Sequence, residues 1–187
     1  MSFITQVTIS VVIYFIIRFS YKREKSLYLA ASASAISYTA MYLFTYEIIN
    51  ILPTIHFMVT GLSLLFLFIA YNEIIILERK VNKIKKGEII DTESFPIEKG
   101  YKIVFSLLGI GLLFISLALI SGLTMQSVFT ANLIFKAIFT FIAWLIYLIT
   151  IMGVKFFNFP IKYATRSLFI AMWAVLIAYY MNSYLIG

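Results

Sequence analysis

Six long apolar runs decide what kind of fold this sequence can adopt. Each run is about 20 residues long, which is the length of helix that crosses the hydrocarbon core of a bilayer. Hydrophobic residues make up 63% of the 187 residues and charged residues only 12%, whereas roughly a quarter of the residues in a soluble domain are charged. We therefore predict an all-α fold, a polytopic membrane helix bundle that forms a single integral membrane domain over residues 1–187. The expected transmembrane helices, about six in number, cover residues 3–18, 27–46, 54–77, 103–123, 132–153 and 166–186.

The placement of Lys and Arg predicts how these spans are oriented. If the six spans alternate in direction, all of the 15 basic residues except Lys136 fall on one side. Positive residues accumulate on the cytoplasmic side, so both termini are expected on the outer side and the polar segment 78–102 in the cytoplasm or matrix. We thus expect an integral protein of the bacterial inner (cytoplasmic) membrane or of the mitochondrial inner membrane. The net charge of +7 is then a topology signal, and no nucleic-acid partner is expected.

The first two spans carry packing and processing signals. The run 3–17 has no basic residue before it and no small-residue cleavage site after it, so we expect a retained helix rather than a cleaved signal. The second span has Ala and Ser clustered in its first half. Small side chains let membrane helices approach closely, so this helix is expected to pack between others.

His56 is the only histidine in the chain, and it lies in the first turn of the third span. Thr60 and Ser63 follow at helical spacing on the same side. A polar stripe in a membrane helix faces protein or a cavity rather than lipid. The functional interpretation is that His56 is an axial ligand to heme or another metal centre. The alternative is a structural histidine that is hydrogen-bonded at the membrane interface.

Lys136 is the second unusual polar residue, because both the helix dipole and the positive-inside rule disfavour a cation at the outer start of a helix. It follows Asn132, a plausible N-cap. An anion is expected to compensate its charge: Glu47, a lipid phosphate, or the carboxylates of a ligand such as heme propionates. The alternative is a lysine that extends to the outer headgroups.

Other kinds of chemistry are excluded by residues that the sequence lacks. With no Cys there is no disulfide and no thiolate metal site. A single histidine with no Asp nearby cannot form a Ser/His/Asp set, so no catalytic residue is expected and the protein is not expected to be an enzyme. Glu73 is expected at the inner interface. No carboxylate or arginine is expected at mid-membrane, which argues against an ion-coupled transporter.

From His56 onward, an ordered set of segments resembles a known family. The segments are IHFMVTGLSLLFLFIAY at 55–71, FPIEKGYKIVFSLLGIGLLFISLALISGL at 95–123 and ANLIFKAIFTFIAWLIYLI at 131–149. Together they resemble the transmembrane cytochrome c assembly family, which includes the cytochrome c synthase, HemX-type and YpjD-type proteins, and most of all the YpjD-type branch. The resemblance covers about three-quarters of the chain. It implies the helical fold and a link to heme or cytochrome biology, with His56 and Lys136 as the functional positions and Trp144 as a packing position.

The sequence also departs from that family. The tryptophan-rich outer loop that presents heme in the synthases is missing, and Phe135 stands where YpjD-type relatives tend to have histidine. The later histidines of the synthases are missing too. Any bound heme would therefore need a different second axial ligand, and Met125 and Met181 are candidates because they are soft and lie near the outer face.

Three functional hypotheses follow. The first is a protein of heme handling or cytochrome complex assembly, with heme as cofactor and His56, Lys136 and Met125 as cofactor-binding residues. The second is a non-catalytic structural or accessory subunit of a larger, respiratory membrane complex. The third is a small lipid or solute transporter, for which only Thr60, Ser63, Ser116 and Thr140 offer polarity at mid-membrane.

Overall fold

A computed structural model gives the arrangement of the chain. It describes residues 3–20, 25–45, 51–87, 97–125, 131–157 and 159–184; within these ranges, the side chains of residues 25, 97, 131–133 and 179–184 are not described. The described part of the chain folds into six α-helices and contains no strand. These helices are α1 (Phe3–Ser20), α2 (Lys25–Thr45), α3 (Ile51–Lys85), α4 (Ile97–Thr124), α5 (Ala131–Phe157) and α6 (Ile161–Tyr184).

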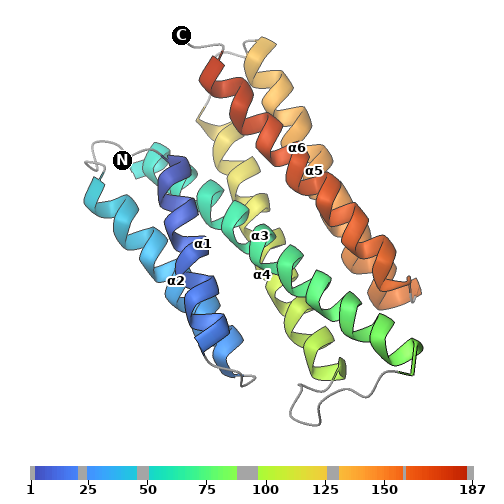
Figure 1. Ribbon diagram of the computed structural model, residues 1–187. Coiled ribbons are helices and arrows are strands. Elements are labelled where there is room, and N and C mark those ends of the chain that lie inside the picture. The colour runs from blue at the N-terminus through green and yellow to red at the C-terminus, as the bar shows by residue number, and fades with distance from the viewer. Residues whose placement is uncertain are drawn as a thin grey trace.

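Each helix is long and apolar enough to cross a membrane, which confirms the predicted all-α membrane bundle. Successive helices run in opposite directions, so α1 begins and α6 ends at the same end of the bundle (Figure 1). We call this end the outer end, following the orientation that the charges predict, and the opposite end the inner end.

The helices extend further than the apolar runs indicate, chiefly at the inner end. Helix α3 continues past the predicted span to Lys85, and α4 begins at Ile97, so both ends of the polar segment 78–102 are helical. The predicted loop 154–165 is mostly helical as well, because α5 runs to Phe157 and α6 starts at Ile161. The reason is that Glu, Lys and Arg are good helix formers, so hydropathy marks where a helix leaves the lipid and not where it ends.

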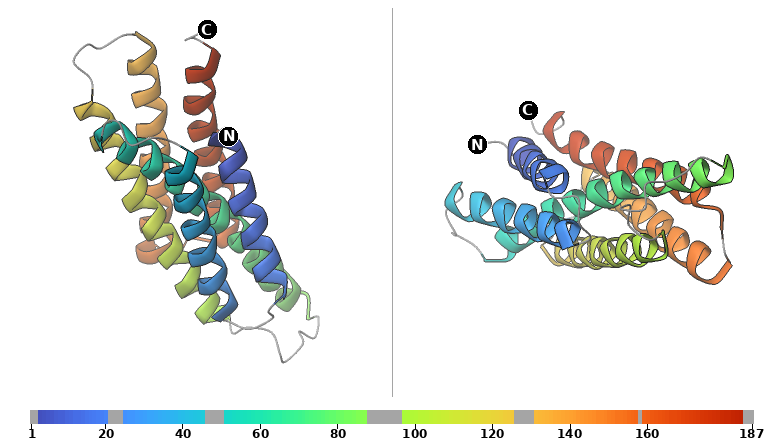
Figure 2. Two further views of the ribbon diagram at one scale, coloured as in Figure 1. Left: turned by 90° about the vertical axis from the view of Figure 1, so that its left-hand side faces the viewer. Right: turned by 60° about the horizontal axis from the view of Figure 1, so that its bottom comes forward.

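Helix α3 is the central element of the bundle. It packs against α1, α2, α4 and α6, and the views in Figure 2 show it between the α1–α2 pair and the α5–α6 pair. Helices α3, α4, α5 and α6 form a closed ring, because each one contacts the next and α6 contacts α3. Helices α1 and α2 contact each other and join the described part of this ring only through α3. Helix α2 contacts α1 and α3 and lies at the edge of the bundle (Figure 1), so it is not enclosed between other helices as its small residues predict.

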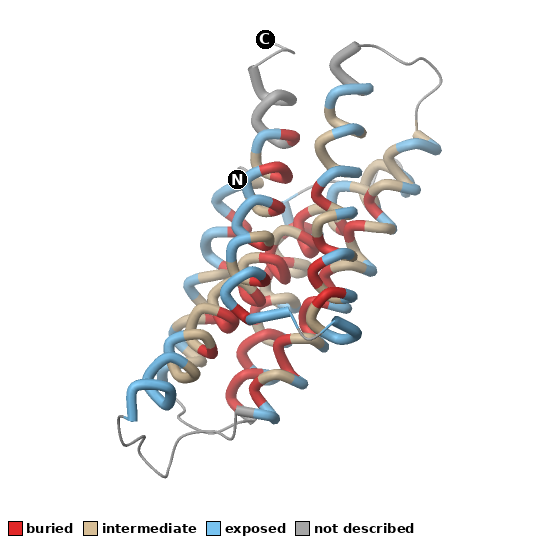
Figure 3. The backbone as a smooth tube through the Cα atoms, turned by 90° about the vertical axis from the view of Figure 1, so that its right-hand side faces the viewer, coloured by how far each residue is buried: buried red, intermediate tan, exposed pale blue. Residues whose placement is uncertain are grey.

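The side chains divide into an interior set and a lipid-facing set. Buried positions follow the helix surfaces that face one another, whereas exposed positions follow the outside of the bundle (Figure 3). Many of the exposed side chains are large and apolar, among them Ile138, Phe141 and Leu145 on α5 and Ile170 and Trp173 on α6. An apolar exterior is what a bilayer requires, so the surface agrees with membrane insertion.

Gly61 lies directly against the side chains of Tyr38 on α2 and Phe3 on α1. A Cβ atom at this position would lie 1.8 Å from the hydroxyl oxygen of Tyr38 and 2.9 Å from the ring of Phe3. The Tyr38 side chain is fully buried and packs edge-on against Phe3, so it has no free space into which to move. The missing side chain of Gly61 therefore leaves the space on α3 that Tyr38 and Phe3 fill.

We predict that Gly61→Ala destabilises the protein by about 1–3 kcal/mol, the usual cost of overpacking a core. The measurement is equilibrium unfolding in detergent micelles. Gly109→Ala is the matched control, because a Cβ at Gly109 meets nothing within 4 Å. Equal stability of the two variants would contradict the packing argument.

Candidate functional site

The candidate site is a cavity at the outer end of the four-helix ring. Its volume is about 370 Å³, it is partly open to the surface, and it lies between α3, α4, α5 and α6, with Phe3 reaching it from α1. Cavities between bundle helices are common places for ligands, and this volume falls in the lower part of the range of about 300–1,000 Å³ that is usual for ligand pockets. Most of the wall is apolar. The polar or sulfur-containing side chains that line it are His56, Thr60, Ser63, Met125, Lys136 and Thr140.

The cavity brings together the three residues that the sequence selects as cofactor-binding. His56 comes from α3 and Lys136 from α5, while Met125 directly follows the last residue of α4. Thr60 and Ser63 line the same cavity, so the predicted stripe on α3 faces a cavity and not lipid.

The predicted orientation puts six further residues at the outer end, and the structure describes them in part. Glu47, Asn50 and Gln126 lie outside the described residues. For Asn132, Met181 and Asn182 the backbone is described but the side chain is not. Met125 is thus the candidate second ligand whose position the structure gives.

The His56 ring is held against α4. Its Nδ1 atom lies 2.9 Å from the hydroxyl oxygen of Ser121. The ring also packs on Gly122, where a Cβ atom would be 3.0 Å from Cε1 of the ring. Two consecutive residues of α4 therefore fix where the imidazole lies at the cavity.

The hydroxyl groups deeper in the cavity donate their hydrogens to backbone carbonyl groups of their own helices. Thr60 donates to the carbonyl oxygen of His56 at 2.7 Å, and Ser63 donates to that of Thr60 at 2.8 Å. On α5, Thr140 donates to the carbonyl oxygen of Lys136 at 2.8 Å. Because each hydroxyl has a single hydrogen, these three groups offer only acceptor lone pairs to a ligand. The cationic donor of the cavity is Lys136, near its outer end.

These residues fit a heme in their chemistry. Imidazole nitrogen and thioether sulfur are both established axial ligands of heme iron, and an ammonium group can pair with a carboxylate. The apolar walls suit a flat, largely apolar ligand. Among the described residues, no group of three His, Cys, Asp or Glu side chains is placed to hold a metal ion. The ligating side chains at the cavity are those of His56 and Met125.

Trp144 has the packing role that the resemblance implies. Its ring nitrogen donates to the hydroxyl oxygen of Ser116 at 2.8 Å, and its ring stacks on Phe141 with centroids 5.7 Å apart. Ser116 in turn donates to the carbonyl oxygen of Leu112 at 2.7 Å. This contact joins α4 to α5 without either side chain lining the cavity.

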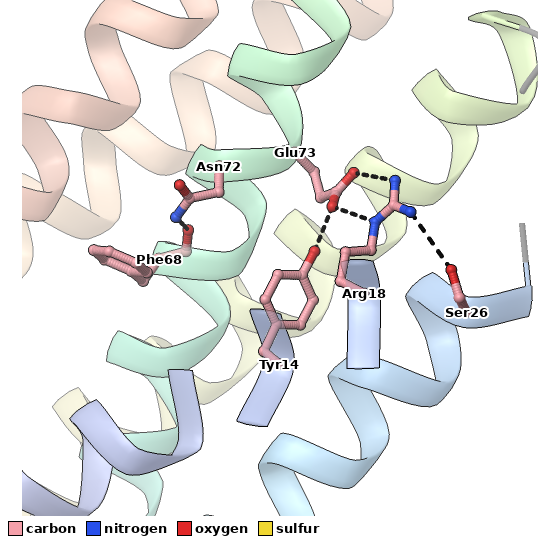
Figure 4. A network of polar contacts seen from close by, with 6 residues as sticks. All are labelled: Tyr14, Arg18, Ser26, Phe68, Asn72 and Glu73. Atoms are coloured by element: carbon pink, nitrogen blue, oxygen red, sulfur yellow. Dashed lines mark hydrogen bonds and ion pairs between the residues drawn. The ribbon is translucent and has the colours of Figure 1, made fainter. Parts of the chain in front are cut away.

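A second polar cluster lies toward the inner end, where Arg18, Tyr14 and Glu73 meet (Figure 4). Arg18 Nε donates to Glu73 at 2.8 Å and one terminal nitrogen donates to the second carboxylate oxygen at 3.3 Å. The hydroxyl of Tyr14 donates to the same carboxylate, and Arg18 also reaches Ser26 of α2 at 3.4 Å. The ion pair thus joins α1 to α3, and the hydrogen bond to Ser26 adds α2.

The sequence predicts Glu73 at the inner interface and no carboxylate or arginine at mid-membrane, and both statements about depth stay predictions. The structure adds that Glu73 is paired inside the bundle, where its side chain is only 5% exposed and that of Arg18 is 19% exposed. Their opposite charges compensate each other in low-dielectric surroundings.

The sequence does contain a signal for this cluster. Gln6, Ser10, Tyr14 and Arg18 follow one another at intervals of four residues along α1, and the first three are buried. Residues at this spacing share one helix face, so the sequence could have predicted that α1 has a polar face directed into the bundle. It could not have predicted that this face meets Glu73 of α3, because residues 18 and 73 are far apart in the sequence.

Comparisons with other proteins do not assign a family. The sequence matches no protein-family model, and no curated protein or solved structure is significantly similar to it. The resemblance to cytochrome c assembly proteins accordingly remains a prediction from the quoted segments.

We predict that Arg18→Met destabilises the protein by about 3–5 kcal/mol, because it leaves the buried Glu73 carboxylate without its counter-charge. Equilibrium unfolding in micelles measures this loss. The double variant Arg18→Met/Glu73→Gln should recover more than half of it. Arg79→Met is the control, since Arg79 is exposed and lies on the same helix as Glu73. A double variant no more stable than Arg18→Met would contradict the pairing argument.

Proposed function

We propose that this membrane protein binds heme at its outer end and takes part in heme handling for cytochrome assembly. The observation that carries the proposal is the convergence of His56, Met125 and Lys136 on one apolar cavity. His56 and Lys136 are 80 positions apart in the sequence, and each of the three residues has a side chain that a heme could use. The resemblance of the segments from His56 onward supports the same function.

Each residue has a separate part in this proposal. His56 would hold the iron through its imidazole, whose Nδ1 lies 2.9 Å from the hydroxyl oxygen of Ser121. Met125, just after the end of α4, would offer its thioether sulfur to the iron. Lys136 would pair with a carboxylate of the heme near the mouth of the cavity. The apolar walls exclude water from the macrocycle, and bound heme would supply an iron centre that can change oxidation state.

The position of the cavity favours a protein that binds and releases heme over one that keeps heme permanently for electron transfer. It is partly open and lies at the outer end, which is the side on which the synthases of the family that the sequence resembles present heme. A ligand at this place can enter or leave without crossing the bundle. A transient carrier or presenter of heme is therefore the form of the function that we propose.

The first test is the absorption spectrum of the protein purified from heme-supplemented cells. We expect a Soret band, and we expect His56→Ala to lose it while keeping the unfolding profile of the wild type. A folded wild-type protein with no Soret band after supplementation would overturn the proposal. The accessory-subunit hypothesis would then be tested by co-purification of other membrane proteins after mild detergent extraction.

We predict that Lys136→Met weakens heme binding roughly tenfold, the effect of losing about one charge-assisted hydrogen bond. Titration of the apoprotein with heme in micelles gives the dissociation constant. Lys155→Met is the matched control, because Lys155 lies at the other end of the same helix and is exposed. Equal heme affinities of the two variants would show that Lys136 does not contribute to heme binding.

We also predict that Met125→Leu changes the axial coordination of bound heme without abolishing binding, because leucine keeps the bulk but removes the sulfur. Loss of the thioether–iron charge-transfer band in the ferric spectrum is the expected result. An unchanged ferric spectrum would show that another group is the second ligand.

A further inference from the structure

Two residues of α4, Ser121 and Gly122, hold the ring of His56 at the cavity. Ser121 and Gly122 stand at the outer end of α4, in the Ser-Gly-Leu sequence that closes this helix. Ser121 contacts the ring nitrogen Nδ1, Gly122 lies under the ring, and Leu123 lines the cavity. The geometry around Ser121 decides which nitrogen of the ring carries the proton.

Ser121 has one hydrogen to donate, and the distances show where it goes. Its hydroxyl oxygen lies 2.7 Å from the carbonyl oxygen of Leu117 and 3.2 Å from that of Ala118. The first distance is typical of an O–H···O bond. The hydrogen of Ser121 is therefore used within α4, and its lone pairs remain to accept a hydrogen from another group.

The ring nitrogen Nδ1 of His56 is the group placed to donate that hydrogen. Its distance to the Ser121 oxygen is 2.9 Å, which is typical of N–H···O. A neutral imidazole with its hydrogen on Nδ1 has a bare lone pair on Nε2. Metal-binding histidines are commonly held in this way, with the second nitrogen hydrogen-bonded to a neighbouring acceptor.

Gly122 supplies the space that this contact needs. A Cβ atom at position 122 would lie 3.0 Å from Cε1, 3.6 Å from Nδ1 and 3.8 Å from Nε2 of the His56 ring. An alanine here would press on the edge of the ring that carries both nitrogens. The ring could then not keep its present distance from Ser121 without a shift of α3 or α4.

We infer that Ser121 and Gly122 are positioning residues that hold His56 as the Nδ1–H tautomer, so that Nε2 is the ligand-binding nitrogen of the cavity. The tautomer follows from the hydrogen bonds alone. The identity of what Nε2 binds rests on the proposed function. In the competing arrangement the proton is on Nε2, and Nδ1 accepts the hydrogen of the Ser121 hydroxyl.

The test uses the fact that the chain has one histidine. Protein labelled with ¹⁵N-histidine gives nitrogen signals from His56 alone, and their shifts and proton couplings distinguish the two tautomers. At a pH where the ring is neutral, we expect the Nδ1–H form to exceed the Nε2–H form by roughly tenfold, as one hydrogen bond would produce. A wild-type ring found mainly as Nε2–H would overturn the inference.

Variants separate the hydrogen bond from general packing. We expect Ser121→Ala to move the ring toward Nε2–H, and Ser121→Thr to keep the wild-type tautomer because it retains a hydroxyl. Ser116→Ala is the matched control on the same helix, since its hydroxyl contacts Trp144 and not His56. If Ser121→Ala leaves the tautomer ratio unchanged, Ser121 is not the positioning residue.

A second arm addresses heme. We expect Ser121→Ala and Gly122→Ala to shift the Soret band or weaken heme binding several-fold, whereas Ser121→Thr stays close to the wild type. If no form of the protein binds heme, the proposed function fails while the nuclear magnetic resonance result still decides the tautomer. If heme binds but none of the variants alters it, His56 is held by other contacts and the inference fails.

Discussion

In hydrocarbon, a polar side chain must find its partner within the protein, because no water is present to take its place. This constraint explains most of the polar contacts of the bundle. Hydroxyl groups such as those of Thr60 and Thr140 bond to the carbonyl one turn earlier in their own helix. Other groups bond between helices, as Trp144 does with Ser116 and Arg18 with Glu73. The contacts between helices are therefore the ones that specify how the helices are arranged.

Both polar clusters depend on α3. His56 lies near its outer start and Glu73 nearer its inner end, and the helix between them is packed against four neighbours. The polar residues around His56 are accessible from a partly open cavity. The cluster of Tyr14, Arg18 and Glu73 is buried, and its opposite charges neutralise each other. A ligand-binding role fits the first arrangement, and a structural role fits the second.

The sequence predicted the membrane class, the six spans and the inward polar stripe on α3, because hydropathy and helical spacing are local properties. It also predicted that His56 and Lys136 share one end of the bundle, since the alternation of spans carries that information. It could not predict that Arg18 meets Glu73, or that Ser121 meets His56, because these contacts depend on how helices pack. Helix ends were also misjudged where charged residues with high helix propensity continue a helix beyond the lipid, as at Lys85 of α3.

The Arg18–Glu73 pair has a consequence for the depth of the cavity. Helix α1 is synthesised before α3. Arg18 therefore lies at the inner boundary of the membrane without the Glu73 carboxylate until α3 has been inserted. Once the two pair, the axial position of α3 relative to α1 is set. His56 lies on the same rigid helix about 25 Å from Glu73, at 1.5 Å per residue. The ion pair on one side of the bilayer thus fixes the height of the imidazole on the other, and a slip of one helical turn would move the ring by about 5 Å.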